Sequence, residues 1–491
     1  MESNRFFLNH TADALCRPLA FLFECLFLNG WVPTDWRLAH ITPIFKKGDA
    51  SQVSNYRPIS LTSVCCKVME TVIKNKIMSY LLDRKLISRQ QHGFLSRHST
   101  CTQLLECVND WSIALNSKNS VDVSYIDFSR AFDSVVHSKL LCKLVSYGIR
   151  DDLLTWLKAF LYGRQQCVVI NNIKSPVCQI LSGVPQGSVV GPLLFLLYVN
   201  DVVDIFDINV TCKLYADDLK LYTVIGNSNP ASPLNVAHAK LADWALKWQL
   251  SVNTEKCKIL HLGTQPSPSV YSLDNTVIQA SNFINDLGVD IDSCLKFDHH
   301  FSRIIARAYQ RINLIFRGFV TRDPTFLKQC YVTYVRPILE YCSSVWSPHL
   351  LKDIDAFERV QKYFTRRVYG LKTFEYKERL FILNLESLEL RRLISDLGMY
   401  FKIVHKLIDL DFGDFFNWSP SGLLTRGHSF KLELKKCQSD IYKFSFANRC
   451  IRCWNSLPAD VVNSSSVNIF MSKLKNLKLD EFLVGRTLVD L

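Results

Sequence analysis

Two apolar, strand-like runs in this chain each end at an acidic residue. Residues 121–126 are followed by Asp127, and residues 213–216 are followed by Asp217 and Asp218, after which a further apolar run begins. Short runs rich in β-branched and aromatic residues favour strands, so the second segment predicts two strands joined by a tight acidic turn. If the strands are neighbours in one sheet, their carboxylates lie together at its edge.

Carboxylates on neighbouring strands suit phosphoryl transfer that depends on divalent cations. Two Mg²⁺ ions about 3.5 to 4 Å apart can stabilise both the attacking hydroxyl and the leaving pyrophosphate, and oxygen ligands suit Mg²⁺. Asp127 and Asp217 are the more direct candidate ligands, and Asp218 is the less direct one. An isolated Asp-Asp pair is more often a solvated hairpin turn, so this pair does not establish a site by itself.

Two further features accompany the acids. Phe132 follows Asp127 by five positions, where its ring could lie beneath a nucleotide sugar and exclude a 2′-hydroxyl; core packing is the alternative. Gly183 and Gly187 flank Gln186 in a segment without the G-x-G-x-x-G or Gly-Lys-Ser/Thr pattern of phosphate loops. A turn at these glycines could bring the Gln186 amide to a base or sugar, although a lone loop of this kind is an ordinary helix entry.

The charge of the chain points to polyanions. Lys and Arg number 58 against 45 Asp and Glu, a net charge of +13, which is typical of nucleic-acid-binding proteins and also of some generally basic proteins. The 17 cysteines have no regular spacing and follow no secretory signal, so we expect reduced thiols in the nucleus or cytoplasm, and no secretion. The apolar runs 19–28 and 189–199 are shorter than the roughly 20 residues that a membrane span needs, so no membrane partner is expected.

The pattern of predicted secondary structure changes along the chain. Residues 1–29 predict part of an amphipathic N-terminal helix, residues 30–292 alternate strand-like and helical segments, and the chain is mainly helical from about residue 293. Residues 264–269 look like a hairpin loop. Cys450 and Cys453 lack a second ligand pair, because Cys437 and His428 are irregularly placed, so no structural zinc is expected.

The helical pattern over 353–368 has two faces. Its apolar residues are Phe357, Val360, Phe364 and Val368, and its cations are Arg359, Lys362 and Arg366. The spacing places the two groups on opposite sides of one helix. The cations could bind a phosphate backbone, or they could simply be a solvated basic face.

An ordered series of short blocks resembles the reverse transcriptases of non-LTR (LINE-type, jockey-like) retrotransposons. The blocks are Pro43–Asp49, Asn55–Leu61, Gln91–Phe94, Ile126–Asp133, Gly183–Ser188, Tyr215–Asp218 and Leu287–Val289, with Tyr334–Tyr341 and Trp454–Pro458 similar to the tail of jockey-like elements. The resemblance implies an α+β, right-hand polymerase. Fingers and palm with an antiparallel sheet would occupy 30–292 and a helical thumb-like region 293–372. A mainly helical region of unknown role would occupy 373–491.

The resemblance also implies roles for individual residues. The metal ligands would be Asp127, Asp217, Asp218 and the backbone carbonyl of Phe128. Lys46, Lys47 and Arg57 would meet the incoming triphosphate, where a guanidinium suits bidentate phosphate contact. Phe132 would be the sugar gate, Gln186 a nucleotide contact, Lys256 the proton donor to pyrophosphate, and the residues around Leu287 and Gly288 the support of the primer end.

The implied reaction is addition of deoxynucleotides to a DNA primer on an RNA template, with two Mg²⁺ ions. Related elements carry an endonuclease upstream, and this chain begins about thirty residues before its Trp31-Val32-Pro33 block, so we expect no endonuclease activity. Two alternatives stay open: a catalytically silent nucleic-acid-binding remnant, and an RNA-synthesising polymerase, which should lack an aromatic gate at Phe132. The natural template and the oligomeric state are not predicted.

Overall fold

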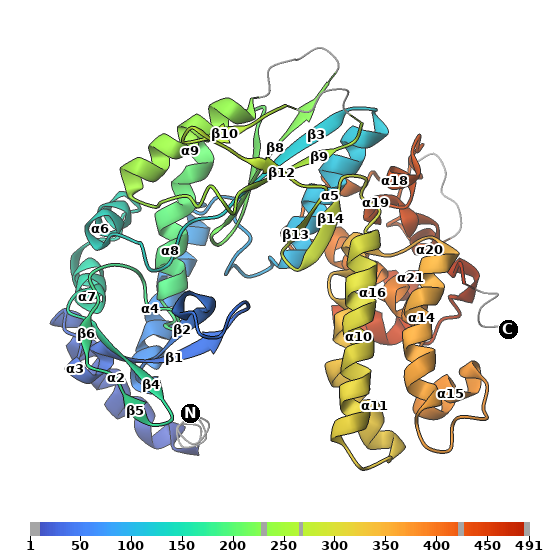
Figure 1. The fold of residues 1–491 in the computed structure, drawn as a ribbon, viewed down its shortest axis with the longest axis horizontal. Coiled ribbons are helices and arrows are strands. Elements are labelled where there is room, and N and C mark those ends of the chain that lie inside the picture. Colours follow the sequence, from blue (N-terminus) through green and yellow to red (C-terminus); the bar gives the residue numbers. More distant parts are fainter. Residues whose placement is uncertain (1–9, 227–232, 265–268, 421–426, 486–491) are drawn as a thin grey trace.

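The computed structural model describes residues 10–226, 233–264, 269–420 and 427–485. The chain forms two arms that extend in the same direction from a connecting region (Figure 1). The N-terminal part forms one arm, the central sheet lies in the connecting region, and helices from α10 (Asp298–Gly318) onward form the other arm. The predicted α+β class and the helical C-terminal region are confirmed.

The central sheet has the strand order β12-β9-β3-β8-β7. Its middle strand, β3 (Ser120–Ile126), pairs antiparallel with β8 (Asp218–Ile225) and β9 (Lys258–Leu262); β7 (Thr211–Tyr215) and β12 (Gln279–Ala280) lie at the edges. The sheet separates two cores, because successive strand residues point to opposite faces. Val121 and Val123 join the core shared with α5 (Thr100–Asn116) and the helical arm, whereas Leu219 and Leu221 join the core beneath α8 (Gly191–Val199) and α9 (Leu234–Trp248).

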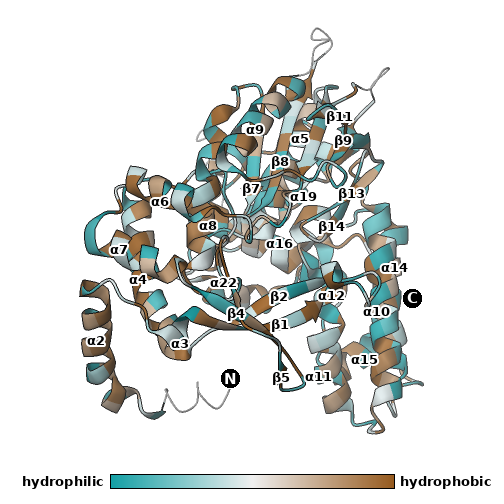
Figure 2. Cartoon of the chain, turned by 60° about the vertical axis from the view of Figure 1, so that its left-hand side comes forward, coloured by the Kyte–Doolittle hydropathy of each residue, from teal (hydrophilic) through white to brown (hydrophobic). Residues whose placement is uncertain are grey.

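A second, smaller sheet lies in the N-terminal arm. It contains β1 (Leu38–Phe45), β2 (Tyr56–Leu61) and β4 (Gln165–Ile170), with the short strands β5 (Ile173–Lys174) and β6 (Cys178–Gln179) paired to β4. The surrounding helices are α2 (Ala12–Leu28), α3 (Thr34–Arg37), α4 (Val64–Asp83), α6 (His137–Ser146) and α7 (Asp151–Leu161). Figure 2 shows that α2 is hydrophobic along most of its length, although Leu26 is its only fully buried residue.

The second arm is helical. Its long helices are α10 (Asp298–Gly318), α11 (Pro324–Tyr334), α14 (Leu351–Arg366) and α16 (Leu388–Val404); the shorter ones include α12 (Arg336–Glu340), α13 (Ser343–Trp346), α15 (Tyr376–Leu383) and α22 (Val467–Leu474). Phe357, Val360, Phe364 and Val368 are all buried, as the helical pattern predicted. Their core is continuous with that of α16 and α22, so the segment after residue 373 packs into the same body as α10 and α14.

The structure also describes the longest apolar helices and the cysteines. Within the described ranges, no helix is both long and apolar enough to cross a membrane. All 17 cysteines lie in the described residues, and none of them forms a disulfide. The predicted hairpin loop at 264–269 falls largely outside the described residues.

Candidate active site in the central cleft

The acidic residues meet at the ends of paired strands. The β3–β8 register places Ile126 opposite Leu219, so Asp127, one residue beyond β3, lies beside the turn that joins β7 to β8. That turn contains Ala216, with a positive φ of 57°, followed by Asp217 and Asp218. The strands that carry the acids are therefore neighbours, as the proposed pairing of their carboxylates requires.

A loop far away in sequence holds the acidic turn in place. The side-chain oxygen of Gln91 accepts hydrogen bonds from the backbone N–H groups of Ala216 (2.9 Å) and Gly93 (2.7 Å). A Cβ at Gly93 would lie 2.4 Å from the nitrogen of Ala216, so only glycine fits this approach. The sequence identified 91–94 as a block without a role, and this contact supplies one.

Burial and neighbouring charges raise the pKa of Asp217 and of Asp218. Burial in the cleft, followed by the charge of Asp127, raises the pKa of Asp217, while Arg57 and Lys46 act in the opposite direction. Desolvation and the neighbouring charge of Asp217 raise the pKa of Asp218 to about 6. Carboxylates that repel one another in this way favour a bound cation.

These acids fit divalent cations in donor chemistry, since carboxylate oxygens are the hard donors that such cations prefer. The Asp127 side chain is 40% exposed, which leaves its oxygens accessible. In the part of the chain that the structure describes, however, no group of three or more His, Cys, Asp or Glu side chains is preassembled to hold a metal ion.

Lys256 lies at the same site. Its ammonium nitrogen is 3.2 Å from Oδ2 of Asp127. Asn253 fixes this geometry, because its backbone N–H donates to the carbonyl of Asp127 and its own carbonyl accepts from the Lys256 N–H. Phe128 forms an isolated antiparallel bridge with Val252. The hydrogen bonds of this bridge are accepted by the carbonyls of Asp127 and Ser251, and the Phe128 carbonyl takes part in neither of them.

Cations of the N-terminal arm face the acids. The hairpin of β1 and β2 carries Lys46 and Lys47 at its tip and Arg57 on β2, and all three side chains are exposed. The backbone N–H of Lys46 bonds the carbonyl of Asn55, which closes the hairpin. Lys46 and Arg57 are near enough to lower the pKa of Asp217, so the fold brings two of the three predicted cations toward the acids.

Gln186 lies in a loop that is bonded on both sides. Its side-chain amide N–H donates to Oδ1 of Asp133 (2.9 Å), and its backbone carbonyl accepts from the backbone N–H of Ser60 on β2. A Cβ at Gly183 would lie 2.8 Å from the Asp133 carbonyl, which explains the glycine there. Asp133 was not predicted as a partner of Gln186.

The ring of Phe132 is half-buried. It stacks on Phe195 of α8, with centroids 4.2 Å apart, and meets the edge of Phe94 at 6.3 Å. The core packing considered from the sequence therefore exists, and the ring is still partly accessible.

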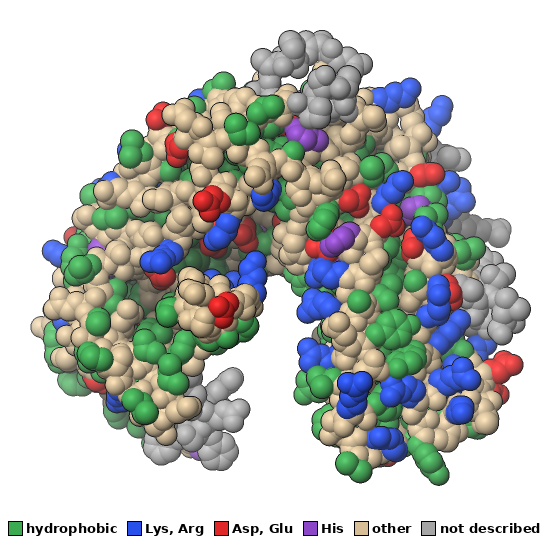
Figure 3. All heavy atoms as spheres, viewed as in Figure 1, with side chains coloured by type: hydrophobic (Ala, Val, Ile, Leu, Met, Phe, Trp, Pro, Cys, Tyr) green, Lys and Arg blue, Asp and Glu red, His purple; other side chains and the backbone are tan. Residues whose placement is uncertain are grey.

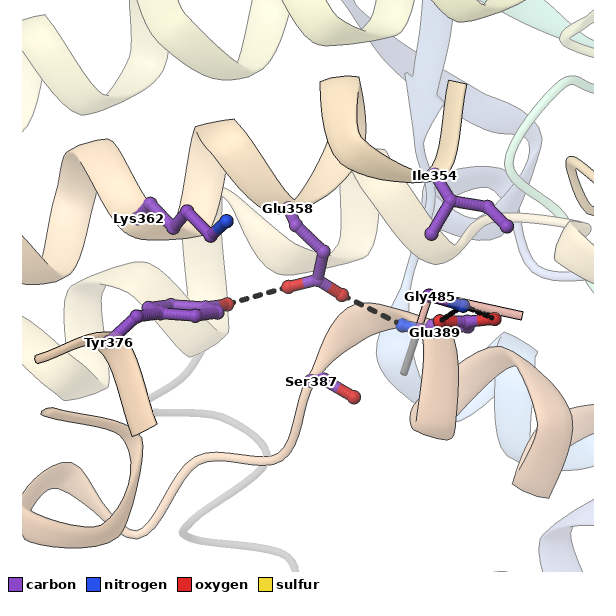
Figure 4. Close-up of a pocket in the computed structure, with 7 residues that line it drawn as sticks. All are labelled: Ile354, Glu358, Lys362, Tyr376, Ser387, Glu389 and Gly485. Carbon is purple, nitrogen blue, oxygen red and sulfur yellow. Dashed lines mark hydrogen bonds between the residues drawn. The ribbon is translucent and has the colours of Figure 1, made fainter. Parts of the chain in front are cut away.

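The three cations predicted on α14 differ in their surroundings. Arg359 lies 2.8 Å and Lys362 3.7 Å from the carboxylate of Asp355, and Arg366 is exposed. Figure 4 shows Lys362 beside Tyr376, whose ring centroid is 5.3 Å from the ammonium nitrogen. The cavity there is about 10 Å³, which is room for a water molecule at most.

Basic residues concentrate in the helical arm. Residues 293–372 contain 14 Lys and Arg against 6 Asp and Glu. On α10, Arg307 and Arg311 are exposed one turn apart. Figure 3 shows a deep hollow between the two arms, with Lys and Arg side chains along the edge formed by the helical arm.

Taken together, the fold and site define a mixed α+β protein of the right-hand polymerase class, with neighbouring aspartates at the ends of the paired strands β3 and β8. A sequence profile of the family described as reverse transcriptase (RNA-dependent DNA polymerase) matches residues 44–291, about half of the chain. The chain belongs to this reverse transcriptase family.

Its relatives come from mobile elements. The RNA-directed DNA polymerase from mobile element jockey of Drosophila melanogaster is 32% identical over 302 residues, which cover 60% of this chain and 33% of that protein. The probable RNA-directed DNA polymerase from transposon BS of the same organism is 29% identical over 350 residues, covering 67% of this chain and 38% of that protein. The resemblance to non-LTR retrotransposon reverse transcriptases is confirmed. The chain spans 33% to 42% of the length of the first curated relatives that it matches.

Among solved structures, apo telomerase from Candida tropicalis aligns with a TM-score of 0.43 and 13% identity, over 79% of this chain and 67% of that chain.

Proposed function

We propose that this chain is an RNA-directed DNA polymerase that adds deoxynucleotides to the 3′ end of a DNA primer on an RNA template. The observation that carries the proposal is the placement of Asp127 beside Asp217 and Asp218, at the ends of the paired strands β3 and β8. Membership of the reverse transcriptase family supports the same reaction.

Each residue near the acids receives a role in this proposal. Asp127, Asp217, Asp218 and the Phe128 carbonyl would hold two Mg²⁺ ions, which when bound neutralise charge that develops on the phosphates. Lys46, Lys47 and Arg57 bind the triphosphate of the incoming deoxynucleotide. Gln186, oriented by Asp133, contacts the nucleotide, and Phe132 excludes a 2′-hydroxyl. Lys256 donates a proton to the leaving pyrophosphate.

The primer and template bind between the arms. The excess of cations in 293–372 supports this placement, since a phosphate backbone is bound mainly by Lys and Arg. Arg359, Lys362 and Arg366 of α14 and the exposed Arg307 and Arg311 of α10 are the proposed backbone contacts.

A primer-extension assay with the purified chain tests the proposal. We expect Mg²⁺-dependent extension of a DNA primer on an RNA template, with deoxynucleotides preferred over ribonucleotides. Binding of primer-template without any extension would favour the silent remnant. Equal use of ribonucleotides would favour an RNA-synthesising enzyme.

A further inference from the structure

A buried ion pair joins the strand that follows the catalytic turn to a distant hairpin. Lys220 lies on β8, two residues after Asp218, and its ammonium group pairs with the carboxylate of Asp286. The two side chains are only 4% and 5% exposed. Alternation along β8 places Lys220 on the same side of the sheet as Asp218, whereas Leu219 and Leu221 enter the opposite core.

The surroundings of Lys220 fix the position of its ammonium group. The nitrogen lies 3.8 Å from the sulfur of Cys107 on α5, and the ring centroids of Trp111 and Tyr125 are 6.0 and 5.6 Å away. A lysine held between a helix and a sheet has little rotamer freedom. Asp286 is therefore paired with a charge of defined position.

Asp286 is the last residue of β13 (Phe283–Asp286), which forms a hairpin with β14 (Val289–Asp292). The turn between them consists of Leu287 and Gly288, with φ of 46° and 90°. Two residues with positive φ are typical of a tight hairpin turn whose twist matches the strands. The turn thus has a defined shape and follows directly from the ion pair.

The helical arm holds the other side of this hairpin. The Tyr341 hydroxyl donates to the carbonyl of Leu287 (2.9 Å), and Arg303 of α10 donates to the carbonyl of Gly288 (2.9 Å). Arg303 also pairs with Asp290 on β14. A continuous set of polar contacts therefore runs from α10, through the hairpin, to β8 and its acidic turn.

We propose that Lys220 and Asp286 are a positioning pair: they set the distance between the Leu287–Gly288 turn and the Asp217–Asp218 turn, and so place the primer 3′ end relative to the acids. This inference rests on the proposed polymerase function and on the primer-supporting role implied for the hairpin. Neither residue touches the reacting atoms.

The position of the pair distinguishes it from a simple stabilising contact. An apolar pair of similar volume stabilises a buried site as well as an ion pair does, or better. An ion pair instead fixes a relative geometry, and this pair joins the two turns between which a primer end would lie. Misplacement of reacting groups by about 1 Å can cost up to about a hundredfold in rate, so a small shift of the hairpin should be measurable.

The test replaces both charges together, by Lys220→Met with Asp286→Leu, so that neither charge stays buried alone. The matched control is Lys240→Met with Asp207→Leu, which removes an exposed ion pair of 2.7 Å far from the hairpin. Primer-template Kd, the single-turnover rate constant and the amplitude of extension are measured for each chain. We expect the rate constant of the Lys220 and Asp286 variant to fall about tenfold or more. Its Kd should stay within about threefold of the parent, because phosphate contacts dominate binding.

A purely structural role would lower the amplitude, which reports the folded fraction, and leave the rate constant of the remaining molecules unchanged. A rate constant within about twofold of the parent, in a variant that is folded, would overturn the proposal. Hydrogen exchange of residues 283–292 gives a second readout that needs no activity. Exchange there should be faster in the Lys220 and Asp286 variant and unchanged in the control; equal protection in both would also overturn it.

Hydrogen exchange separates the two proposals. If the parent chain does not extend primers, the polymerase function fails, and the exchange of 283–292 still decides whether the ion pair fixes the hairpin. If the double variant does not fold, Lys220→Gln with Asp286→Asn takes its place, because these neutral side chains are close in size to the originals and again leave neither charge buried alone. The expected and contradicting exchange results are the same for that variant.

Discussion

The ammonium nitrogen of Lys256 lies 3.2 Å from a carboxylate oxygen of Asp127. The proposed proton donor and a proposed metal ligand thus form an ion pair with each other. Both side chains are well exposed, at 64% and 40%, so the pair contributes only about 0 to 1 kcal/mol. A cation that binds Asp127 competes with this ammonium group.

Lys256→Met should therefore have two separable effects. Loss of the competing charge should lower the half-saturating Mg²⁺ concentration by up to about fivefold, the equivalent of about 1 kcal/mol. Loss of the proton donor should reduce the maximal extension rate by about a hundredfold or more. Titration of Mg²⁺ in the extension assay measures both. An unchanged maximal rate would remove Lys256 from the proposed chemistry.

Removal of the acids should separate catalysis from binding. Asp127→Ala and Asp217→Ala should each abolish extension, because the carboxylates hold the ions, while primer-template binding stays close to the parent because Lys and Arg dominate it. Asp207→Ala is the control, since it removes an exposed carboxylate elsewhere. Extension near the parental rate in either site variant would contradict the metal assignment. Equal loss of binding and extension would indicate misfolding.

Local patterns predicted the central sheet well. The strand-like run 121–126 corresponds to β3, and the runs on either side of the acidic turn correspond to β7 and β8. Side-chain alternation and the apolar content of each run carry this information within a few residues. The adjacency of β3 and β8, and hence of Asp127 and Asp217, was an expectation that pairing in the sheet fulfils.

The contacts that support the site were not predictable in the same way. Gln91 bonds Ala216 across 125 positions, and Lys220 pairs with Asp286 across 66. A polar residue carries no local signal for a partner so distant, and a buried lysine is rare enough that sequence favours exposure. The β1–β2 hairpin also gave no clear strand signal, since its tip is exposed and includes Lys46 and Lys47. The Gly93 position was the one available hint of close packing.

Salt dependence should distinguish the basic surfaces. Each phosphate contact contributes about 0.9 to the slope of log K against log salt for duplex DNA. Neutralising Arg359, Lys362 and Arg366 together should make the slope less steep. The change should be smaller than the loss of three phosphate contacts would give, because Asp355 already pairs with Arg359 and Lys362. The double variant Arg307→Gln with Arg311→Gln should reduce the magnitude of the slope by about two, or about one for each cation removed.

Binding measured from low to moderate salt provides the slopes, with Lys240→Gln as a control for a distant exposed charge. If the variant of the three α14 cations keeps the parental slope, α14 is a solvated basic face. If the α14 variant and the Arg307 and Arg311 variant of α10 both keep the parental slope, the primer-template does not bind along these helices.

Stability should fall in mild acid. His238 is buried on α9 and lies 2.9 Å from the Ser124 hydroxyl, and burial lowers its pKa from 6.5 to about 4. Above pH 6.5 the residue is neutral in both states. Below it the unfolded chain binds a proton that the folded chain excludes until about pH 4, so stability is lost as pH falls through this window. The loss from pH 7 to 5 is roughly 2 kcal/mol.

His238→Gln should reduce that loss, because glutamine cannot bind the proton and can still bond Ser124. Denaturant midpoints at pH 7 and 5 for both chains measure the difference. Ser124→Ala is the control, as it removes the hydrogen bond and keeps the titrating ring. Identical pH dependence of the parent and His238→Gln would assign the acid sensitivity to other groups.

The selection of deoxynucleotides should depend on the Phe132 ring. The ring stacks on Phe195, and its accessible part could lie beneath a bound sugar, so a shorter side chain opens space for a 2′-hydroxyl. We expect Phe132→Val to keep deoxynucleotide extension within about tenfold, the equivalent of about 1.4 kcal/mol, and to gain measurable ribonucleotide incorporation. Valine is preferred to alanine because it leaves a smaller gap beside Phe195; emptying a fully buried phenylalanine site would cost about 3 to 5 kcal/mol, and the half-buried Phe132 ring should cost less.

Phe94→Val distinguishes a sugar gate at Phe132 from a general loosening of the packing around that ring. Phe94 is 51% exposed and meets the edge of Phe132, so this variant alters the packing of the Phe132 ring without shortening it. Ribonucleotide incorporation by Phe132→Val alone is the result expected of a gate, because only that change removes atoms from beneath the sugar. The same gain in Phe94→Val would mean that selectivity depends on general rigidity. If the parent already uses both kinds of nucleotide equally, Phe132 is core packing, and the argument for DNA rather than RNA synthesis loses its structural basis.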